Sequence, residues 1–379
     1  MKILLIGNAN SFWIKEYVQY VLLNEENDIF IVSKPVTNKE FKYFYSNSSV
    51  QILNTDKGTF LIDFIPKIRT LVNMRKKVKK EFKRGMFDII HIHSVPSNFM
   101  IKFLSKKIIK YGKSLICTYW GSDLLSKSKE QLENAIPCLE KAKYISYSSD
   151  GMDKYFHDVF GDIYNSKIQR AKFGISIYDV INQVKKEKTK EECKEFFGIN
   201  KDKISVAIGY NGNKRQHHID VIKEIGKLNK EILDKICLIV QLSYGLSSEE
   251  YRQEILDELN KIDVEFVVID DFLDKLKSAM LRLATDIFVH AQESDAFSAS
   301  IQECVYGGSI LINPSWIMYK EFDNVGIDYL TYNSYEQIGE YINNIIDKKV
   351  DINNSDKVHL LYDKYSWQAV KEDWLKLYS

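Results

Sequence analysis

The chain has 379 residues, of which 45% are apolar and 28% are charged, with 53 Lys and Arg against 52 Asp and Glu. This length suits two domains of roughly 150 to 200 residues each, and the presence of only five prolines excludes a disordered or low-complexity chain. The five cysteines are widely spaced and form no C-x-x-C pair, which excludes a disulfide framework and a zinc knuckle. We expect a folded protein of a reducing cytoplasm.

Short apolar runs alternate with helical patterns along the first half of the chain. The runs are KILLIG, DIFIVS, VQILNT, DIIHIH, SLICTYW and KYISYSS. The segments between them are long enough for crossover helices, so the alternation predicts a doubly wound parallel sheet with helices on both faces. We place this Rossmann-like domain at residues 1–177.

A polar, charge-rich stretch at residues 178–203 contains a short helical pattern but no strand pattern, and we interpret it as the interdomain connection. The alternation resumes in ISVAIGYN, ICLIVQLSY, VEFVVID, DIFVHAQ, SILINP and IDYLTYN. A second Rossmann-like domain is therefore predicted at 204–360, followed by a helix at 361–379. Because ligands of such sheets bind beyond the carboxyl ends of the strands, the loops after ISVAIGYN, VEFVVID and DIFVHAQ should line one site.

The balanced net charge conceals an asymmetry between the two halves. Residues 1–150 hold 24 basic and 14 acidic side chains, a balance of +10, so the remainder carries −9. Residues 65–85 and 101–113 hold most of the excess, and we predict amphipathic helices there with Lys and Arg on the exposed side. Such faces attract an anionic membrane surface, and an ordinary solvated helix face is the alternative. No nucleic-acid motif accompanies the charge, so nucleic acid is not an expected partner.

The start MKILLIGN has neither the length nor the cleavage site of a signal peptide, and no run of about 18 apolar residues occurs. We therefore expect no membrane-spanning helix, and a peripheral position at the inner face of the cell membrane.

One acidic motif in the second half precedes a predicted helix. In ESDAFSASIQECVYGG, residues 293–308, Asp295 and Glu303 lie eight positions apart around a turn of small residues. Two helical turns need about seven residues, so both carboxylates can face one ligand held at the helix start. The alternatives are that Asp295 is a structural charge at the helix N-terminus and that Glu303 is an ordinary exposed carboxylate.

The segment DIFVHAQESDAFSASIQECVYGGSILI resembles the second-domain signature of family-4-type GT-B glycosyltransferases, in which a strand leads to an E-x7-E element, a small-residue helix and a Gly. FDIIHIH, TYWGSDL and YSWQAVKEDWLKLY are similar to that family's fourth strand, glycine loop and final helix. The resemblance implies an acceptor-binding first domain that faces a nucleotide-sugar-binding second domain across a cleft, with the final helix packing on the first domain. The chain departs from the pattern at Asp295, where the family has Glu, and at Trp120, where it has His.

The resemblance also implies the donor site residue by residue. Glu303 would hold the ribose hydroxyls of the donor, and Asp295 would lie beside the donor sugar. The amides at the helix start would cradle the diphosphate, because a helix N-terminus carries about half a positive charge. These amides belong to Ser298, Ala299 and Ser300. Further donor contacts are expected at Gly209, Asn211 and Phe272.

Two cations follow the first strand of the second domain. Lys214 and Arg215 can neutralise the leaving diphosphate without a metal, and a solvated pair of loop cations is the alternative. The adjacent His217 and His218 do not share a helix face and so do not chelate easily. The segments GYNGNKRQHHID and QLSYG are similar to bacterial 4-acetamidofucose transferases that act on a lipid-linked sugar.

The acceptor side of the site is expected on the first domain, at Gly7, Asn8, Asn10, Trp120 and Gly121. Asp123 either reaches the sugar or the acceptor, or caps the helix that follows it. His91 and His93 alternate on a predicted buried strand, and we interpret them as packed or hydrogen-bonded core residues.

The chain lacks Asp-x-Asp, and neither G-x-G-x-x-G after the first strand nor G-x-x-x-x-G-K-[ST] occurs. We therefore expect no metal and no cofactor. The expected activity is transfer of a sugar from a nucleotide diphosphate sugar, UDP or dTDP rather than GDP, to a hydroxyl of a lipid-linked or polysaccharide acceptor in bacterial cell-surface glycan synthesis. The family-4 resemblance implies retention of the anomeric configuration, and the acetamidofucose resemblance allows inversion with a base such as Asp123. A nucleotide-sugar 2-epimerase of the same fold, a non-catalytic partner subunit and a homodimer stay open.

Overall fold

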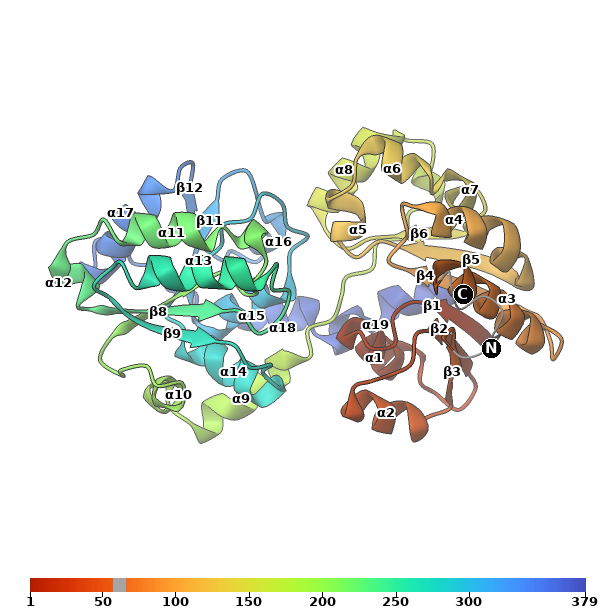
Figure 1. Ribbon diagram of the computed structural model, residues 1–379, viewed down its shortest axis with the longest axis horizontal. Coiled ribbons are helices and arrows are strands. Elements are labelled where there is room, and N and C mark those ends of the chain that lie inside the picture. Colours follow the sequence, from red (N-terminus) through yellow and green to blue (C-terminus); the bar gives the residue numbers. More distant parts are fainter. Residues whose placement is uncertain (57–65) are drawn as a thin grey trace. The chain divides into compact units, whose positions relative to one another are not determined.

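The structure, a computed structural model, describes residues 1–56 and 66–379, without the side chains of residues 66–68. The chain forms two compact units, shown in Figure 1. The first unit comprises Met1–Phe173 together with Val370–Ser379, and the second comprises Gly174–Ala369. Residues 178–203, expected as an interdomain connection, lie within the second unit, where they form α9 (Ile177–Glu187) and α10 (Lys190–Phe196).

Six parallel strands in the order β3-β2-β1-β4-β5-β6 form the sheet of the first unit. They are β1 (Lys2–Ile6), β2 (Asp28–Ser33), β3 (Val50–Asn54), β4 (Phe87–His93), β5 (Gly112–Thr118) and β6 (Tyr144–Ser146). All six strands expected in the first half are thus confirmed. The central strands consist almost entirely of buried apolar side chains, as a parallel sheet covered on both faces requires.

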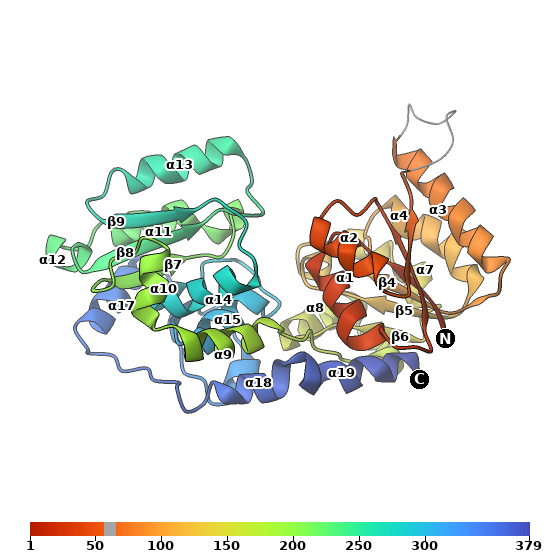
Figure 2. The ribbon, with the colours of Figure 1, turned by 90° about the horizontal axis from the view of Figure 1, so that it is seen from below.

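The helices of the first unit are α1 (Phe12–Tyr17), η1 (Val18–Leu22), α2 (Lys39–Ser46), α3 (Pro66–Phe82), α4 (Phe99–Phe103), η3 (Leu104–Ile108), η4 (Ile109–Tyr111), α5 (Ser122–Leu125), α6 (Lys129–Glu133), α7 (Ile136–Leu139), α8 (Asp150–Phe160) and η5 (Asn165–Lys167). The expected helix at 65–85 forms as α3, which ends three residues early at Phe82, and residue 65 lies outside the described residues. Figure 2 shows α3 alongside the strands of this sheet.

The expected single amphipathic helix at 101–113 is wrong. The chain passes from α4 into a π-helical turn, η3, and then into a 3-10 turn, η4. The wider winding of the π turn keeps both Ile108 and Ile109 buried. Gly112 then begins β5 so close to β4 that a Cβ there would lie 2.6 Å from Ile90 Cγ1. Lys113 therefore belongs to a strand, and only the residues before Gly112 are helical.

Six parallel strands in the order β12-β11-β10-β7-β8-β9 form the sheet of the second unit. They are β7 (Ile204–Ile208), β8 (Ile236–Gln241), β9 (Glu265–Ile269), β10 (Ile287–Val289), β11 (Ile310–Pro314) and β12 (Leu330–Tyr332). These are the six strands expected in the second half. The strand order reverses between β7 and β10, and the crevice at such a switch point is where doubly wound sheets bind ligands.

The remaining helices are η6 (Lys214–Gln216), α11 (His218–Ile225), α12 (Lys230–Leu233), α13 (Glu249–Leu259), α14 (Lys275–Ala284), α15 (Ala299–Gly307), α16 (Lys320–Asp323), α17 (Glu336–Ile346), α18 (His359–Tyr365), α19 (Trp367–Leu375) and η7 (Lys376–Tyr378). The C-terminal segment is anchored in the first unit by two buried aromatic residues. Trp374 Nε1 donates to the Lys172 carbonyl oxygen at 2.7 Å, and the Tyr378 hydroxyl lies 2.9 Å from that of Tyr17.

Candidate functional site

Two loops meet at the switch point of the second unit. The loop after β7 begins at Gly209, whose amide donates to the Val289 carbonyl oxygen of β10 at 3.0 Å. Gly209 has φ +64°, and a Cβ there would lie 2.8 Å from Gln216 Oε1, so this turn requires glycine. Further along the loop, Arg215 Nη2 donates to Ser294 Oγ at 2.9 Å. The loops after β7 and β10 thus form one connected surface at the carboxyl edge of the sheet.

Asp295 is held by three donors. The Tyr210 hydroxyl donates to Oδ1 at 3.4 Å, while the Tyr319 hydroxyl and the Ser298 amide donate to Oδ2 at 3.1 and 2.7 Å. Burial and the nearby carboxylate raise the pKa of Tyr319 well above its usual value, so this hydroxyl stays protonated and remains a donor. The contact with the Ser298 amide, next to the start of α15, fits the alternative that Asp295 is a structural charge at the helix N-terminus. The same side chain follows β10, at the switch point of the sheet where a donor sugar is expected.

A sharp turn presents the start of α15. Phe297, just before the helix, has φ 62°, a strained conformation for a bulky residue, and Gln302 Nε2 donates to its carbonyl oxygen at 2.9 Å. The Phe297 ring packs on Tyr319 at a centroid distance of 5.3 Å, which fixes the turn. The first-turn amides have no intrahelical acceptor, so this end of α15 is suited to an anion.

Glu303, on the second turn of α15, forms a buried ion pair. Arg282 Nε of α14 donates to Glu303 Oε2 at 3.1 Å, and the two side chains are only 8% and 14% exposed. The two helices approach closely because of Gly307, where a Cβ would lie 2.7 Å from the Arg282 carbonyl oxygen. Since Arg282 occupies one carboxylate oxygen, it fixes the side chain while Oε1 can accept from a ligand.

Several residues of this site were not predicted from the sequence. Tyr244 follows β8 and is 42% exposed as a residue, while its hydroxyl end is buried and interacts with Asn211, Ser300 and Glu303. Burial raises the pKa of Tyr244, so it too is a hydroxyl donor. Its position in QLSYG, at a predicted strand end, was the available signal. The other missed residues are Tyr210 and Gln292, which stand in the segments GYNGNKRQHHID and DIFVHAQ, and Arg282 and Tyr319, which lie outside the motif.

The two candidate cations point in different directions. Arg215 contacts the loop after β10 through Ser294, whereas the Lys214 ammonium lies 5.1 Å from the centroid of the Tyr251 ring on α13. Of the two, the structure places Arg215 at the turn that precedes α15. Phe272, in the loop after β9, is 75% exposed at the carboxyl edge of the same sheet.

In the first unit, Asp123 holds the loops after β4 and β5. Its Oδ1 accepts from the amides of Trp120 and Gly121, both at 2.9 Å, and its Oδ2 accepts from the Val95 amide at 3.0 Å. Burial raises the pKa of Asp123 in spite of these three hydrogen bonds. Gly121, with φ 142°, is required at this turn. Asp123 lies within α5, whose N-cap Gly121 receives no side-chain cap hydrogen bond, so Asp123 holds the loops before this helix and does not cap a helix that follows it.

The other acceptor-side candidates lie at the carboxyl ends of the strands of the first unit. Asn10 links the loops after β1 and β2, since its Oδ1 accepts from the Thr37 amide at 2.7 Å and its Nδ2 donates to the Pro35 carbonyl oxygen at 2.8 Å. Asn8 is exposed and its Oδ1 accepts from the Asn10 amide at 3.1 Å. At Gly7, a Cβ would lie 3.0 Å from Ile14 Cδ1, so the turn leaves little space for a side chain.

A buried aromatic cluster surrounds the two histidines of β4. His91 contacts the Tyr378 hydroxyl through Nδ1 and Thr118 Oγ1 through Nε2, both at 2.7 Å, which confirms a hydrogen-bonded core residue. His93 stacks on Trp120 at 5.5 Å, and burial lowers its pKa to about 3. In the described part of the chain, no group of three or more His, Cys, Asp or Glu side chains could hold a metal ion.

The chain is similar to a known family over part of its first unit and to solved structures over both units. Residues 2–154 match the model of a family described as glycosyl transferase 4-like. No curated protein sequence matches the chain. Sucrose-phosphate synthase from Thermosynechococcus elongatus is 12% identical with a TM-score of 0.75, and the match covers 100% of this chain and 98% of that one. HepE of Anabaena, solved in complex with UDP and glucose, is 13% identical with a TM-score of 0.71, covering 99% and 98%.

A glycosyltransferase from Rickettsia africae is similar to the same extent, with 15% identity, a TM-score of 0.71 and coverage of 100% and 97%. These likenesses extend over both units, so the chain has the two-domain GT-B fold, as expected. The resemblance to 4-acetamidofucose transferases is tested by none of them and stays a prediction.

Proposed function

We propose that this GT-B glycosyltransferase, whose residues 2–154 are glycosyl transferase 4-like, transfers a sugar from a UDP-sugar to an acceptor hydroxyl. The observation that carries the proposal is the connected surface at the switch point of the second unit. There Arg215 reaches Ser294 beside the start of α15, and Glu303 is fixed through one oxygen only. HepE, which shares the fold, is solved with UDP and glucose, and this supports a pyrimidine donor, UDP or dTDP, over GDP.

Departure of the nucleotide leaves negative charge on its diphosphate. Arg215 and the first-turn amides of α15 would stabilise that charge in the transition state, and preorganised donors of this kind are usually the largest catalytic contribution. The first-turn amides are those of Ala299 and Ser300, whereas the Ser298 amide, also expected from the sequence, already donates to Asp295 Oδ2. Glu303 Oε1 would accept from the ribose hydroxyls, and Asp295 would accept from a hydroxyl of the donor sugar. The exposed ring of Phe272 would stack on the base.

We infer that the reaction retains the anomeric configuration. Inversion needs a protein base near the acceptor hydroxyl, and the sequence offers Asp123 for that role. This carboxylate already accepts from three backbone amides and is buried. Its hydrogen bonds keep the loop in place, so it is poorly suited to move a proton. In a retaining reaction, the leaving phosphate takes the acceptor proton instead.

The acceptor that best fits the charge of the first unit is a lipid-linked or polysaccharide glycan of the bacterial cell surface, reached at the inner face of the membrane. The first unit contains a long basic helix, α3, which exposes Arg75, Lys76, Lys79 and Lys80. Such a face attracts anionic lipid. No helix among the described residues has both the length and the apolar content to cross a bilayer.

Nucleotide-dependent thermal stability tests the donor site. UDP at a hundred times its dissociation constant adds about 2.7 kcal/mol of apparent stability, so UDP, dTDP, GDP and CMP are compared on the wild type and on single variants. We expect a shift with UDP or dTDP that is lost in Glu303→Gln and Arg215→Ala. Two matched controls should keep it: Lys214→Ala, from the neighbouring position, and Glu293→Ala, from the same loop as Ser294.

If no nucleotide stabilises the wild type, the donor site proposal is wrong. If a UDP-sugar is isomerised without any acceptor, the enzyme is an epimerase of the same fold and not a transferase.

A further inference from the structure

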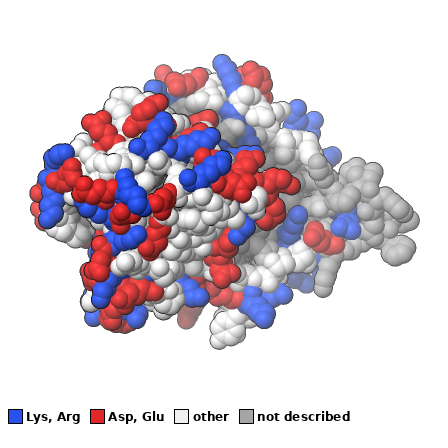
Figure 3. Space-filling view, turned by 60° about the vertical axis from the view of Figure 1, so that its left-hand side comes forward, with Lys and Arg blue, Asp and Glu red and all other residues white. Residues whose placement is uncertain are grey.

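The first unit concentrates positive charge in residues 75–113, which run from α3 to the start of β5. Residues 75–113 contain twelve Lys and Arg but only two acids, Glu81 and Asp88. Both acids are paired, Glu81 with Arg84 at 3.1 Å and Asp88 with Lys113 at 2.7 Å. On the second unit, by contrast, Figure 3 shows acidic and basic side chains interspersed. The excess of charge between residues 75 and 113 is therefore not neutralised by its own segment.

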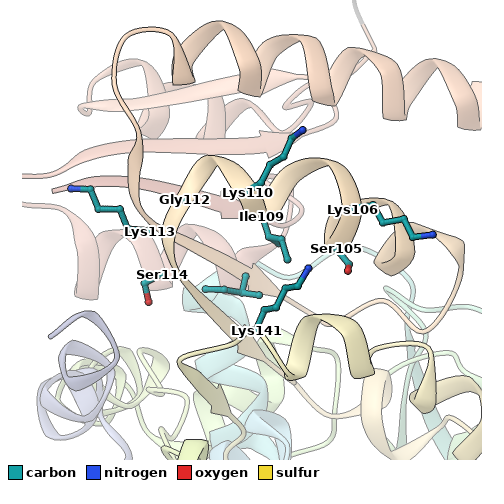
Figure 4. A pocket seen from close by; sticks show the side chains of 9 residues that line it. Ser105, Lys106, Ile109, Lys110, Gly112, Lys113, Ser114 and Lys141 are labelled. Atoms are coloured by element: carbon teal, nitrogen blue, oxygen red, sulfur yellow. The ribbon is translucent and has the colours of Figure 1, made fainter.

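A pocket of about 410 Å³ lies within this basic region. Its lining includes four lysines, Lys106, Lys110, Lys113 and Lys141, together with hydroxyl and apolar groups that include Ser105 and Ile109. Figure 4 shows Lys141 extending from the segment after α7 toward the turn that carries Ser105 and Ile109, while the other lysines project from the rim. The pocket thus has a partly apolar floor and a ring of flexible ammonium groups.

Three of these lysines are available to an external anion. In the part of the chain that the structure describes, no carboxylate forms an ion pair with Lys106, Lys110 or Lys141, and the side chains are exposed. Like charges gathered without counterions repel one another, so a bound anion would relieve an unfavourable interaction. A phosphate group, which offers several acceptor oxygens, fits three ammonium groups well.

The pocket lies away from the expected chemistry. Its residues lie at the amino ends of β5 and β6, since Lys113 is the second residue of β5 and Lys141 precedes β6. The end of α3 is at the same edge, because its Phe82 ring packs on Tyr111 of η4 at 4.9 Å. Donor and acceptor residues follow the carboxyl ends of strands. The pocket is therefore a separate site and not part of the transfer site.

We propose that this pocket binds the phosphate of an anionic phospholipid headgroup, and that the surrounding basic surface of α3, η3 and η4 lies on the membrane. The inference rests on the membrane-facing acceptor in the proposed function and specifies how the protein is held there. A strand of seven residues spans about 20 Å, so a bilayer at the amino edge leaves the carboxyl edge of the first unit that far away. The acceptor hydroxyl would then lie on an extended glycan and not next to the lipid phosphate.

Vesicle binding tests the proposal on the full chain. Cosedimentation with phosphatidylglycerol and with phosphatidylcholine vesicles is compared for the wild type, for Lys106→Gln/Lys110→Gln/Lys141→Gln, and for a control with the same loss of charge in the second unit, Lys186→Gln/Lys188→Gln/Lys223→Gln. Each Lys near an anionic surface contributes about 1 kcal/mol, so the pocket variant should bind phosphatidylglycerol about a hundredfold more weakly. The control should stay within about twofold of the wild type, and salt should weaken wild-type binding.

Three outcomes overturn the proposal: no binding of the wild type to phosphatidylglycerol, equal losses in both triple variants, and a thermal shift with inorganic phosphate in the absence of vesicle binding. The last outcome would identify a soluble phosphate compound as the ligand. UDP-dependent stabilisation is measured on the same triple variant and should be unchanged. A failure of membrane docking is thereby distinguished from a failure of the donor site.

Discussion

The ion pair between Arg282 and Glu303 offers the sharpest test of how the proposed donor site is built. Arg282→Met removes the guanidinium but keeps much of the side-chain volume. It leaves the Glu303 carboxylate, 14% exposed, without the donor that now lies 3.1 Å away. Breaking a buried pair by removing one partner costs about 3–5 kcal/mol, whereas replacing both partners by uncharged groups is often nearly neutral. Arg282→Met/Glu303→Gln should therefore recover most of the stability lost in the single variant.

The assay is a double-mutant cycle. Urea unfolding is followed by hydrogen exchange of peptides from β7, α14 and α15, because two units need not unfold in one transition and a global signal would mix them. We expect a coupling free energy of at least about 2 kcal/mol between the two positions. Lys277→Met, an exposed lysine on the same helix, is the matched control and should change stability by less than about 0.5 kcal/mol.

A single substitution that lowers the unfolding free energy by less than about 1 kcal/mol, with a coupling near zero, would refute the reasoning. Water would then screen the interaction between Arg282 and Glu303, and Arg282 would not hold the Glu303 carboxylate in position to accept from the ribose hydroxyls. Nucleotide affinity is measured alongside stability. If Arg282 only orients Glu303, its loss should weaken UDP binding even at temperatures where the variant is fully folded.

Two further predictions concern the first unit. Asp123→Asn places an amide group where three backbone amides now donate, so one of them must face another donor, and unfolding should require about 1–3 kcal/mol less free energy by urea titration. A variant that is as stable as the wild type but inactive would instead identify Asp123 as a base. Burial lowers the pKa of His93 to about 3, while the unfolded value is about 6.5. The unfolded chain therefore binds one proton more between pH 6.5 and 3, and stability falls as the pH falls. His93→Phe should reduce that slope by about 1.4 kcal/mol per pH unit, and an unchanged slope would show that His93 is protonated when folded.

The strands of both sheets could be predicted from the sequence because each is a short, almost continuous apolar run. All twelve expected strands form, since a short β-branched run can bury all its side chains as the central strand of a parallel sheet and has few other ways to do so. The prediction of one helix at 101–113 was wrong because the spacing of apolar residues cannot distinguish an α-helix from a chain that widens into a π turn. The start of the strand at Gly112 depends on close contact with Ile90, which is distant in sequence.

Only the acidic residues of the site could be predicted from the sequence, and the residues that contact them could not. The motif around Asp295 and Glu303 is local, so its position at the start of a helix could be recognised from spacing alone. The partners that fix these acids, Tyr319 and Arg282 above all, come from other elements and are selected by packing. No local pattern marks an arginine that is buried because a glycine on the neighbouring helix allows close approach.

The aspartate at position 295 is a departure that the structure can explain. Its short side chain fits between the Ser298 amide and the hydroxyls of Tyr210 and Tyr319. Asp295→Glu restores the residue that the family pattern has, but one more methylene pushes the carboxylate against those hydroxyls, and overpacking of this kind costs about 1–3 kcal/mol. We expect Asp295→Glu to lower stability and donor affinity together, and a second change, Tyr319→Phe, to recover part of both by removing the obstructing hydroxyl. If Asp295→Glu is as stable as the wild type and binds UDP-sugar more tightly, the tyrosines do not confine the carboxylate. The shorter acid would then reflect a different donor sugar, and not the way in which the turn before α15 is built.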